Sequence, residues 1–435
     1  MPLPSPRRAA ALLAALLAVT SARADESNFA PYHVGSRAAG MGGAFTALAD
    51  DGSGAWYNPG GLAFVKHSQL SLAGSVYGVV SGSFADALGD GHTFKYSGLN
   101  TLPTTTAAIW KLGPPDGPGD VLSLSVFVPD AVFVDDRDAL GSRQNAFFYV
   151  DQVQTVWAGL GWARKIGRLG VGATAYALLG THHSSLDLTA ISATDTSTYA
   201  TVTGRTDETT YGGALAVGAR WDATDQLHLG LSVTSPAFGT GKRRQFVRAT
   251  VGQGSGSPPL SQVVNAEDLH TAPWQPLRVQ AGVAATFGAL TVSGDVQYLG
   301  ARKRHDDAAR AAEGLDRTME RLAVVNGAIG MEYLVAGRFP IRAGFFTDRS
   351  ASRTPQRYDG TGTDPNASNS SHIDKLGASF SVGSRSDHTS TDVGIAFSGG
   401  TGKDLVPDNF DFGVSKPSTA TQRSVYVFLG SSFEL

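Results

Sequence analysis

The chain has 435 residues, no cysteine and a formal net charge of −3, from 35 Lys and Arg against 38 Asp and Glu. The balanced charge gives no reason to expect a nucleic-acid partner, and the missing thiols exclude disulfides and thiolate metal sites. Glycine is frequent, at 53 residues, which we expect where strands bend around a closed barrel.

The first 24 residues have the three parts of a secretory signal. Arg7 and Arg8 precede an apolar run from Ala9 to Thr20, and Ala22-Arg23-Ala24 gives the small-x-small cleavage pattern. The run is shorter than the ~20 residues of a membrane helix, and no later stretch approaches that length. We predict a cleaved signal peptide over 1–24, followed by either an exported soluble protein or a closed membrane barrel.

A segment of about forty residues, 25–66, follows and does not alternate like a strand. Its small residues over Arg37–Asp50 suit a short, tightly packed helix in a confined space, and Asn58-Pro59 starts a turn. Some of its residues either gate a lumen or only cap a helix and shape a turn: Arg37, Asp50, Asp51, Asn58 and Pro59. Phe29 and Tyr32 either line an inner pocket or belong to a disordered tail.

From residue 67 onward the dominant pattern has period two. Over Leu277–Phe287 an apolar face alternates with a polar one, and after a two-residue link the alternation resumes over Leu290–Tyr298. The same pattern predicts about fourteen strands in all; the others are Leu70–Val80, Thr105–Leu112, Val121–Val128, Thr155–Ala163, Val171–Leu179, Gly213–Trp221, Leu227–Val233, Val324–Tyr333, Ile341–Thr347, Leu376–Gly383, Val393–Gly399 and Val425–Leu435.

Short connections alternate with long ones, as in outer-membrane barrels and unlike soluble sandwiches. The long ones, predicted as outer loops, are Ser81–Thr104, Pro129–Asn145, His182–Thr206, Pro236–Pro276, Gly300–Arg321, Asp348–His372 and Gly400–Gln422. The first contains apolar residues that either form a ligand-capture groove or pack loops together: Phe84, Leu88, Phe94, Leu99 and Leu102.

Other features of these connections admit similar alternatives. The basic runs Lys242–Arg244 and Arg302–Arg304 either meet lipopolysaccharide phosphates or are simply solvated. Asp306–Arg321 is interpreted as a charged surface helix. At the C-terminus, Gly430, Phe433 and Leu435 resemble the signal by which the barrel-assembly machinery recognises a last strand. We therefore expect that machinery and outer-membrane lipid as partners.

Signatures of catalysis are missing from the sequence. It has no Gly-x-Ser-x-Gly elbow, no phosphate loop and no His-Glu-x-x-His, and the pair His182-His183 has no third ligand at a suitable spacing. We predict no enzyme, no cofactor and no metal. A barrel lipid hydrolase stays open as a minor alternative, because its catalytic residues would need no local motif.

The segment Gly35–Ala63 resembles the opening of the long-chain fatty acid transporter family of outer-membrane proteins (FadL type), which includes importers of aromatic hydrocarbons. The family has a glycine-rich stretch, an acidic pair and Asn-Pro-Ala; here these are Gly35–Gly43, Asp50-Asp51 and Asn58-Pro59-Gly60, with glycine at the last position. Looser matches are Gly230–Pro236, Gly294–Tyr298 and Arg342–Phe345. PorV-like barrels, which serve secretion, share this opening.

The resemblance implies a fourteen-stranded barrel over 67–435, with the segment 25–66 folded into the lumen as a hatch. It also implies a ligand site beside the N-terminus and a lateral exit opened by the hatch. A lumen this wide must be plugged or hold water. We expect an outer-membrane channel of a Gram-negative bacterium for passive uptake of hydrophobic small molecules such as long-chain fatty acids or aromatic hydrocarbons. The alternative is a PorV-like structural or secretion barrel without solute transport.

Overall fold

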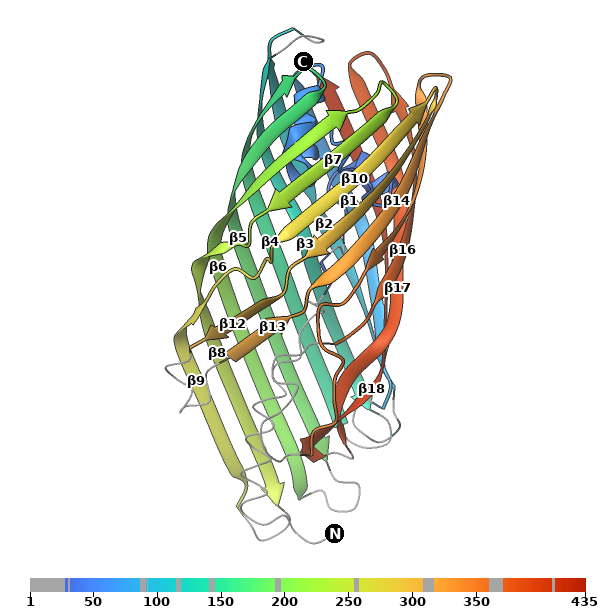
Figure 1. Ribbon diagram of the computed structural model, residues 1–435. Helices are drawn as coiled ribbons and strands as arrows, with labels where there is room; N and C mark the ends of the chain where they lie inside the picture. The colour runs from blue at the N-terminus through green and yellow to red at the C-terminus, as the bar shows by residue number, and fades with distance from the viewer. Residues whose placement is uncertain are drawn as a thin grey trace.

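The computed structural model describes residues 28–435, apart from 30–31, 87–90, 92, 115–118, 141–144, 192–196, 254–257, 308–316, 360–370 and 409–410. The predicted signal peptide over 1–24 lies outside these residues. The described chain is almost entirely β-sheet (Figure 1).

Fourteen antiparallel strands form one closed barrel. Their order around the ring is β5-β4-β3-β2-β1-β18-β17-β16-β15-β14-β11-β10-β7-β6, and the pairing of β6 with β5 closes it. The strands are β1 (Gln69–Phe84), β2 (Phe94–Leu112), β3 (Asp120–Leu140), β4 (Asn145–Ile166), β5 (Leu169–Ile191), β6 (Thr198–Asp222), β7 (Leu227–Thr234), β10 (Arg278–Phe287), β11 (Leu290–Leu299), β14 (Val324–Val335), β15 (Phe339–Asp348), β16 (Lys375–Arg385), β17 (Thr389–Asp408) and β18 (Asp411–Glu434). Each overlaps one of the fourteen predicted segments, so the predicted fold is confirmed.

The distribution of apolar and polar side chains over the two faces of the wall is the reverse of that in a soluble protein. On β10, Val283 and Phe287 are 46% and 60% exposed, whereas Arg278 and Gln280 are buried toward the lumen. Other strands repeat this arrangement, with large apolar side chains outside and serine, threonine or charged residues inside. An apolar exterior of this extent is stable where lipid replaces water.

Four of the predicted long outer loops are wrong in extent, because most residues of Ser81–Thr104, Pro129–Asn145, His182–Thr206 and Gly400–Gln422 continue the strands of the ring. β6 has 25 residues and β10 has 10, against the 9–11 that cross a bilayer. Beyond the membrane both faces meet water, so the apolar–polar contrast disappears; residues 201–210 of β6 read Thr-Val-Thr-Gly-Arg-Thr-Asp-Glu-Thr-Thr. The backbone ladder continues regardless, since each strand still satisfies its neighbour's polar groups.

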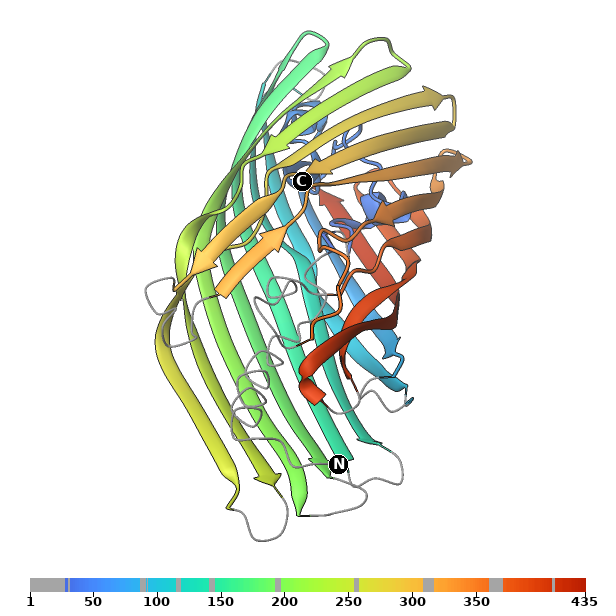
Figure 2. The same cartoon turned by 60° about the horizontal axis from the view of Figure 1, so that its bottom comes forward.

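As a result the wall has unequal height. Figure 2 shows long strands β3 to β6 on one side and short strands β10, β11, β14 and β15 on the other. Two hairpins extend the wall beyond the ring. β8 (Phe238–Gln253) pairs with the far half of β6 and with β9 (Leu260–Thr271), while β12 (Arg302–Asp306) pairs with β13 (Arg317–Arg321). The helix predicted for Asp306–Arg321 is wrong at both ends, because Asp306 ends β12 and Arg317–Arg321 is β13; residues 308–316 lie outside the described residues.

The first described residues, drawn in dark blue, lie inside the ring near the rim of short turns (Figure 1). We call residues 28–65, apart from 30 and 31, the lumenal segment. It contains α2 (Ser36–Gly40), α3 (Gly54–Tyr57) and the 3₁₀ helix η1 (Pro59–Phe64). In the described part of the chain, none of the helices has the length and apolarity to cross a membrane.

Candidate functional site

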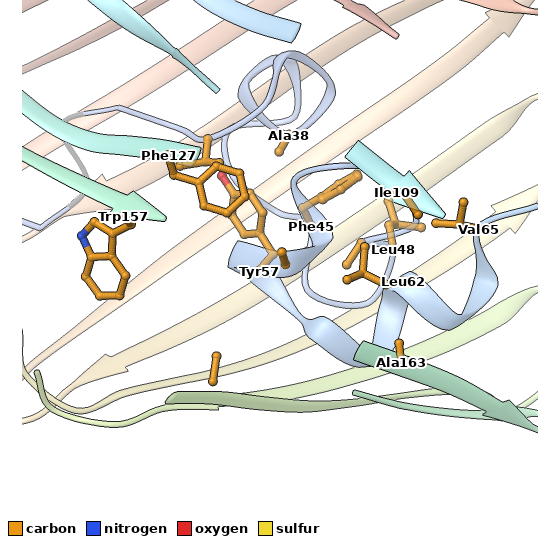
Figure 3. Packing of buried hydrophobic residues seen from close by; sticks show 14 of the residues in the cluster. Ala38, Phe45, Leu48, Tyr57, Leu62, Val65, Ile109, Phe127, Trp157 and Ala163 are labelled. Carbon is orange, nitrogen blue, oxygen red and sulfur yellow. The ribbon is translucent and has the colours of Figure 1, made fainter. Parts of the chain in front are cut away.

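The lumenal segment and the barrel wall bury one hydrophobic core between them. Phe45, Leu48 and Leu62 of the segment are at most 4% exposed. They belong to one buried cluster with residues of β2, β3 and β4, namely Ile109, Val121, Phe127, Trp157 and Ala163 (Figure 3). Each such side chain contributes roughly 1.5–3 kcal/mol by leaving water. The segment is therefore a packed element of the fold.

Buried polar groups fix the segment to specific strands. The Asn58 amide donates to Thr46 O at 2.8 Å and to Ala219 O of β6 at 2.9 Å, and its Oδ1 accepts from Gly60 N at 3.0 Å. On the other side, Asp295 Oδ2 of β11 accepts from the backbone of Phe45 and Thr46 at 2.9 and 2.8 Å. The Asn58-Pro59 turn thus caps η1 and also holds the segment to the wall.

An ion-pair network joins the segment to β14, the neighbour of β11, and again to β6. Arg37 makes a bidentate pair with Glu332 of β14, with both N–O distances at 3.1 Å, and contacts Asp50 at 2.6 Å. Asp50 also pairs with Arg220 of β6 at 3.3 Å. Burial by itself would raise the pKa of Asp50, but the Arg37 and Arg220 guanidiniums outweigh it and hold the pKa below its usual value. Asp50 is therefore an anion bound between two cations.

The network continues along the wall through Arg342 of β15. This guanidinium is fully buried and contacts Glu332 at 2.5 Å and Asp392 of β17 at 2.7 Å. Asp392 in turn accepts from Ser36 Oγ of α2 at 3.1 Å. Two residues of the segment, Arg37 and Ser36, thus attach to one chain of charges that spans β14, β15 and β17.

Asp51 has a local role that differs from that of Asp50. Its Oδ1 accepts from Ser53 N at 2.8 Å and from Ser53 Oγ at 2.6 Å, directly before α3. Burial raises the pKa of Asp51 above its usual value. The structure therefore brings Arg37, Asp50 and Asn58 into contact with the wall, and places Asp51 and Pro59 at helix starts. A role of these five residues in gating remains a prediction.

One wall glycine shows how closely the segment approaches the strands. A Cβ on Gly344 of β15 would overlap with backbone atoms of Met41 and Gly42. Only a residue without a side chain leaves room for this contact. Besides the bending expected from the sequence, glycine therefore also serves to seat the lumenal segment.

Substituting valine for Gly344 is expected to displace the lumenal segment and leave the ring closed. The outcome to measure is ion conductance in planar bilayers, which should rise severalfold over the unaltered protein. Gly294→Val is the matched control, because a Cβ there has no neighbour nearer than Ala328 O at 3.9 Å. Equal conductance of the two variants would contradict this account of the contact.

Between the segment and the long-strand rim lies a cavity of about 190 Å³. Phe29 and Tyr32 line it, as one of the two readings of the sequence expected. Phe29 packs on Leu299 and Val324, and the Tyr32 ring meets Tyr426 edge to face at 5.1 Å. His33 also lines the cavity, and burial lowers its pKa to about 4, so its imidazole is neutral at pH 7. Ligand binding by Phe29 and Tyr32 remains a prediction.

The floor of the cavity is aromatic. Trp56 of α3 contacts Phe127 and Trp157 edge to face, at centroid distances of 6.1 and 5.1 Å, and Trp157 contacts Tyr176 at 5.2 Å. The Arg278 guanidinium lies 3.9 Å from the centre of the Trp56 ring. These residues were not predicted from the sequence. Their signal was present, because Trp157 shares the polar face of its strand with Thr155, Gly159 and Gly161.

The apolar residues predicted for an outer capture loop lie elsewhere. Phe84 ends β1 and Phe94 begins β2, and their rings stack at 6.1 Å in a cluster with Tyr96 and Tyr149. Leu99 is on β2 and 61% exposed on the outside of the wall. Leu102 is also on β2, with its side chain outside the described part, and Leu88 lies outside the described residues. The loop placement is therefore wrong for Phe84, Phe94, Leu99 and Leu102, since the strands extend past the membrane.

The basic runs are also on strands, and several of their members have acidic partners. Lys242 and Arg244 of β8 pair with Asp268 and Glu267 of β9 at 2.7 and 3.6 Å. His182 and His183 point to opposite faces and contact Asp151 and Asp207. Among the residues with described positions, no three His, Cys, Asp or Glu side chains are grouped as metal ligands.

Two further features border the lumenal segment. A second cavity of about 280 Å³ lies toward the rim of short turns; it is lined by charged and hydroxyl side chains, including Arg37, Asp50 and Arg385.

In the wall, the β2–β3 ladder runs only from Leu112↔Asp120 to Thr106↔Val126. Farther out, β2 continues its pairing with β1, and β3 with β4. Pro129 and Asp130 of β3, just past the last β2–β3 pair, line the first cavity.

Comparison with solved structures identifies the architecture. A FadL homologue of Pseudomonas aeruginosa superposes with a TM-score of 0.62 at 13% identity, covering 94% of this chain and 99% of that chain. The toluene transporter TodX of Pseudomonas putida gives 0.62 at 14%, covering 93% and 99%. The toluene transporter TbuX of Ralstonia pickettii gives 0.54 at 13%, covering 93% and 98%. No family model matches the sequence, and no curated protein does so either. The predicted resemblance to FadL-type barrels is thus confirmed at the level of the fold.

Proposed function

On this FadL-type fold, we propose that the protein is an outer-membrane channel for passive uptake of hydrophobic small molecules in a Gram-negative bacterium. Residues 25–66 act as its hatch and residues 67–435 as its barrel. Long-chain fatty acids and aromatic hydrocarbons are the cargo classes that fit. The observation that carries the proposal is the cavity lined by the adjoining aromatic rings of Trp56 of the hatch and Trp157 of the wall.

The cavity suits a hydrophobic solute better than an open, water-filled pore would. Such a solute gains its binding free energy by leaving water, so a water-filled lumen offers it nothing. Tryptophan and phenylalanine faces offer a large apolar area in a lumen that many polar side chains also line. The similar solved structures include toluene transporters and a monoaromatic hydrocarbon channel, which supports the same class of cargo here.

The interrupted β2–β3 ladder supports a lateral route. A solute in the cavity touches Pro129 and Asp130, next to the last β2–β3 pair. Leaving sideways into lipid avoids the polar cavity around Arg37 and Asp50, where an apolar molecule would be unfavourable. We propose that movement of the hatch opens this route.

Uptake by cells with and without the gene tests the proposal. We expect faster accumulation of radiolabelled toluene or oleate in cells that carry the gene, and an intermediate rate for Trp56→Ala, which removes the floor of the cavity. Trp110→Ala is the matched control, because Trp110 is 43% exposed on the outer face. Equal accumulation with and without the gene would reject transport and favour the PorV-like alternative.

A further inference from the structure

One hairpin of the ring is interrupted at the same level on both of its strands. The ladder between β11 and β14 ends at the pair Leu299↔Val324, and pairing resumes at Arg302↔Arg321 between β12 and β13. β12 and β13 form a two-stranded sheet that is separate from the sheet of the barrel. Figures 1 and 2 show this outer hairpin bent away from the line of β11 and β14, toward β8 and β9.

The break between the two ladders has the features of a hinge. It consists of two residues on each strand, 300–301 and 322–323, and three of the four are glycine or alanine. The Gly300 N–H donates to Leu277 O, outside the hairpin. Hinges are a few residues at the ends of elements that absorb a change of backbone angles, and they are often small. The β12–β13 hairpin can therefore turn without loss of the ladders on either side of the break.

The inner face of this hairpin lines the cavity that Trp56 also lines. Arg304 of β12 and Met319 of β13 are paired across the hairpin, and both border the cavity. Met319 is 4% exposed, whereas Lys303 and His305 on the other face are exposed. The hairpin therefore separates part of the cavity from the outside.

A buried ion pair holds the hairpin against the wall. Asp307 directly follows β12 and pairs with Arg243 of β8 at 3.2 Å, and both side chains are at most 7% exposed. The other oxygen of the carboxylate accepts from His270 N of β9 at 2.6 Å. Removing one member of a buried pair leaves a charge uncompensated, which favours any conformation that exposes this charge to water. The Arg243–Asp307 pair is therefore suited to latch the hairpin.

Arginines of the hairpin surround Trp274, which lies in the connection from β9 to β10. The guanidiniums of Arg302, Arg304 and Arg321 lie 5.8, 5.2 and 5.7 Å from the centre of its ring. Arg302 also donates to Ala237 O at 2.9 Å. A guanidinium that leaves such contacts is solvated by water, whereas the apolar core between the hatch and the wall gains nothing from water. The hairpin is therefore held by contacts that water can replace.

We propose that the β12–β13 hairpin is an outer lid of the channel, which turns at residues 300–301 and 322–323 and is latched by the Arg243–Asp307 pair. This inference rests on the proposed function, because it takes the cavity to lie on the path of the cargo. The lid and the hatch are then two gates in series, so a solute can enter the cavity while the hatch still closes the lumen.

Thiol labelling tests whether the hairpin opens. The chain has no cysteine, so the thiol of Met319→Cys is the only one, and a charged methanethiosulfonate reagent reaches it when the lid turns outward. Adding Asp307→Asn should raise the labelling rate about tenfold, because the latch loses its charge. Arg243→Gln breaks the same pair from the wall side and should raise the rate likewise, which keeps the test valid if one variant does not fold. Asp225→Asn is the matched control; Asp225 is 91% exposed and pairs with Arg168, so the rate should stay within about twofold.

A reversible cross-link tests whether this opening serves transport. His270→Cys with Asp307→Cys places two thiols across the latch. Joining them with a bis-methanethiosulfonate reagent should reduce the uptake of radiolabelled toluene by about fivefold or more, because the lid can no longer turn, and dithiothreitol should restore uptake. His305→Cys with Thr318→Cys is the control, since this pair lies within the hairpin and its cross-link leaves the lid free.

The possible results separate the lid from the channel to which it belongs. Equal labelling rates with and without the latch variants would overturn the latch, and unchanged uptake after cross-linking across it would overturn the lid. The channel proposal would stand in both cases. Equal uptake by cells with and without the gene would instead reject the channel, and with it the role of the lid.

Discussion

Deletion of residues 35–51 is expected to leave a folded barrel that conducts ions continuously. The fourteen strands satisfy one another's backbone groups around a closed ring, so the ladder does not depend on the lumenal segment. The deletion removes α2 and the residues that bind Glu332 and Asp295, and it exposes an inner wall of serine, threonine and charged side chains that water can fill. Conductance in planar bilayers should rise by an order of magnitude or more, and cells should become sensitive to large antibiotics.

The fold of the deletion variant has to be checked independently of its conductance. Intact barrels migrate differently from unfolded chains in unheated detergent gels, and this shift should persist. A variant that lost the shift and formed no pore would show that the segment is part of the barrel's scaffold, and the hatch proposal would then fail.

Replacing Glu332 by glutamine is expected to destabilise the docking of the segment by about 3–5 kcal/mol, the usual result of removing one partner from a buried ion pair. The side chain is 8% exposed and pairs with Arg37 and Arg342, with Arg385 at 4.0 Å. Its removal leaves Arg37 and Arg342 with one carboxylate each, Asp50 and Asp392, in place of two. The variant should show a lower thermal transition in detergent and frequent channel openings.

A charge-matched control separates this effect from a general change in charge. Glu434→Gln also removes one carboxylate, but Glu434 is 41% exposed and lies 4.0 Å from His67, so its effect should stay within about 0.5 kcal/mol. The double variant Arg37→Met with Glu332→Met should be less damaging than the sum of its single changes, because each single change leaves the other member of this buried pair without one of its partners and the double variant removes both members. Additive effects would mean that the Arg37–Glu332 pair does not hold the segment.

The barrel strands could be predicted because lipid imposes a chemical contrast on every second residue. Within the membrane, Val283 and Phe287 must be apolar and Gln280 can be polar. The sequence therefore alternates between apolar and polar residues with period two. Past the membrane this contrast ends, and the outer parts of β6 and β8 look like loops. The fourteen strands were therefore found, while the length of β6 and the hairpins β8–β9 and β12–β13 were not.

The candidate site was predictable only in part. The lumenal segment was recognisable from its small residues and its Asn58-Pro59 turn, and Phe29 and Tyr32 were placed near a pocket because they are close to the N-terminus. The partners of Arg37 were not predictable, because Glu332 is about 300 residues away in sequence and meets it only after the ring has closed. Phe84 and Leu99 were assigned to a long connection between strands, and their hydrophobicity suggested a capture groove, although hydrophobicity does not distinguish such a groove from the outer face of a strand.

The sequence by itself determined that the chain forms a closed sheet with an apolar exterior, because alternation is a local property that each strand carries alone. Only the tertiary structure decided what lies inside. The Arg37–Glu332 pair, the fit of Gly344 against Met41, and the placing of Arg278 over Trp56 depend on which strands become neighbours and on how the segment enters the ring. Such contacts join residues far apart in the chain, and no local pattern records them.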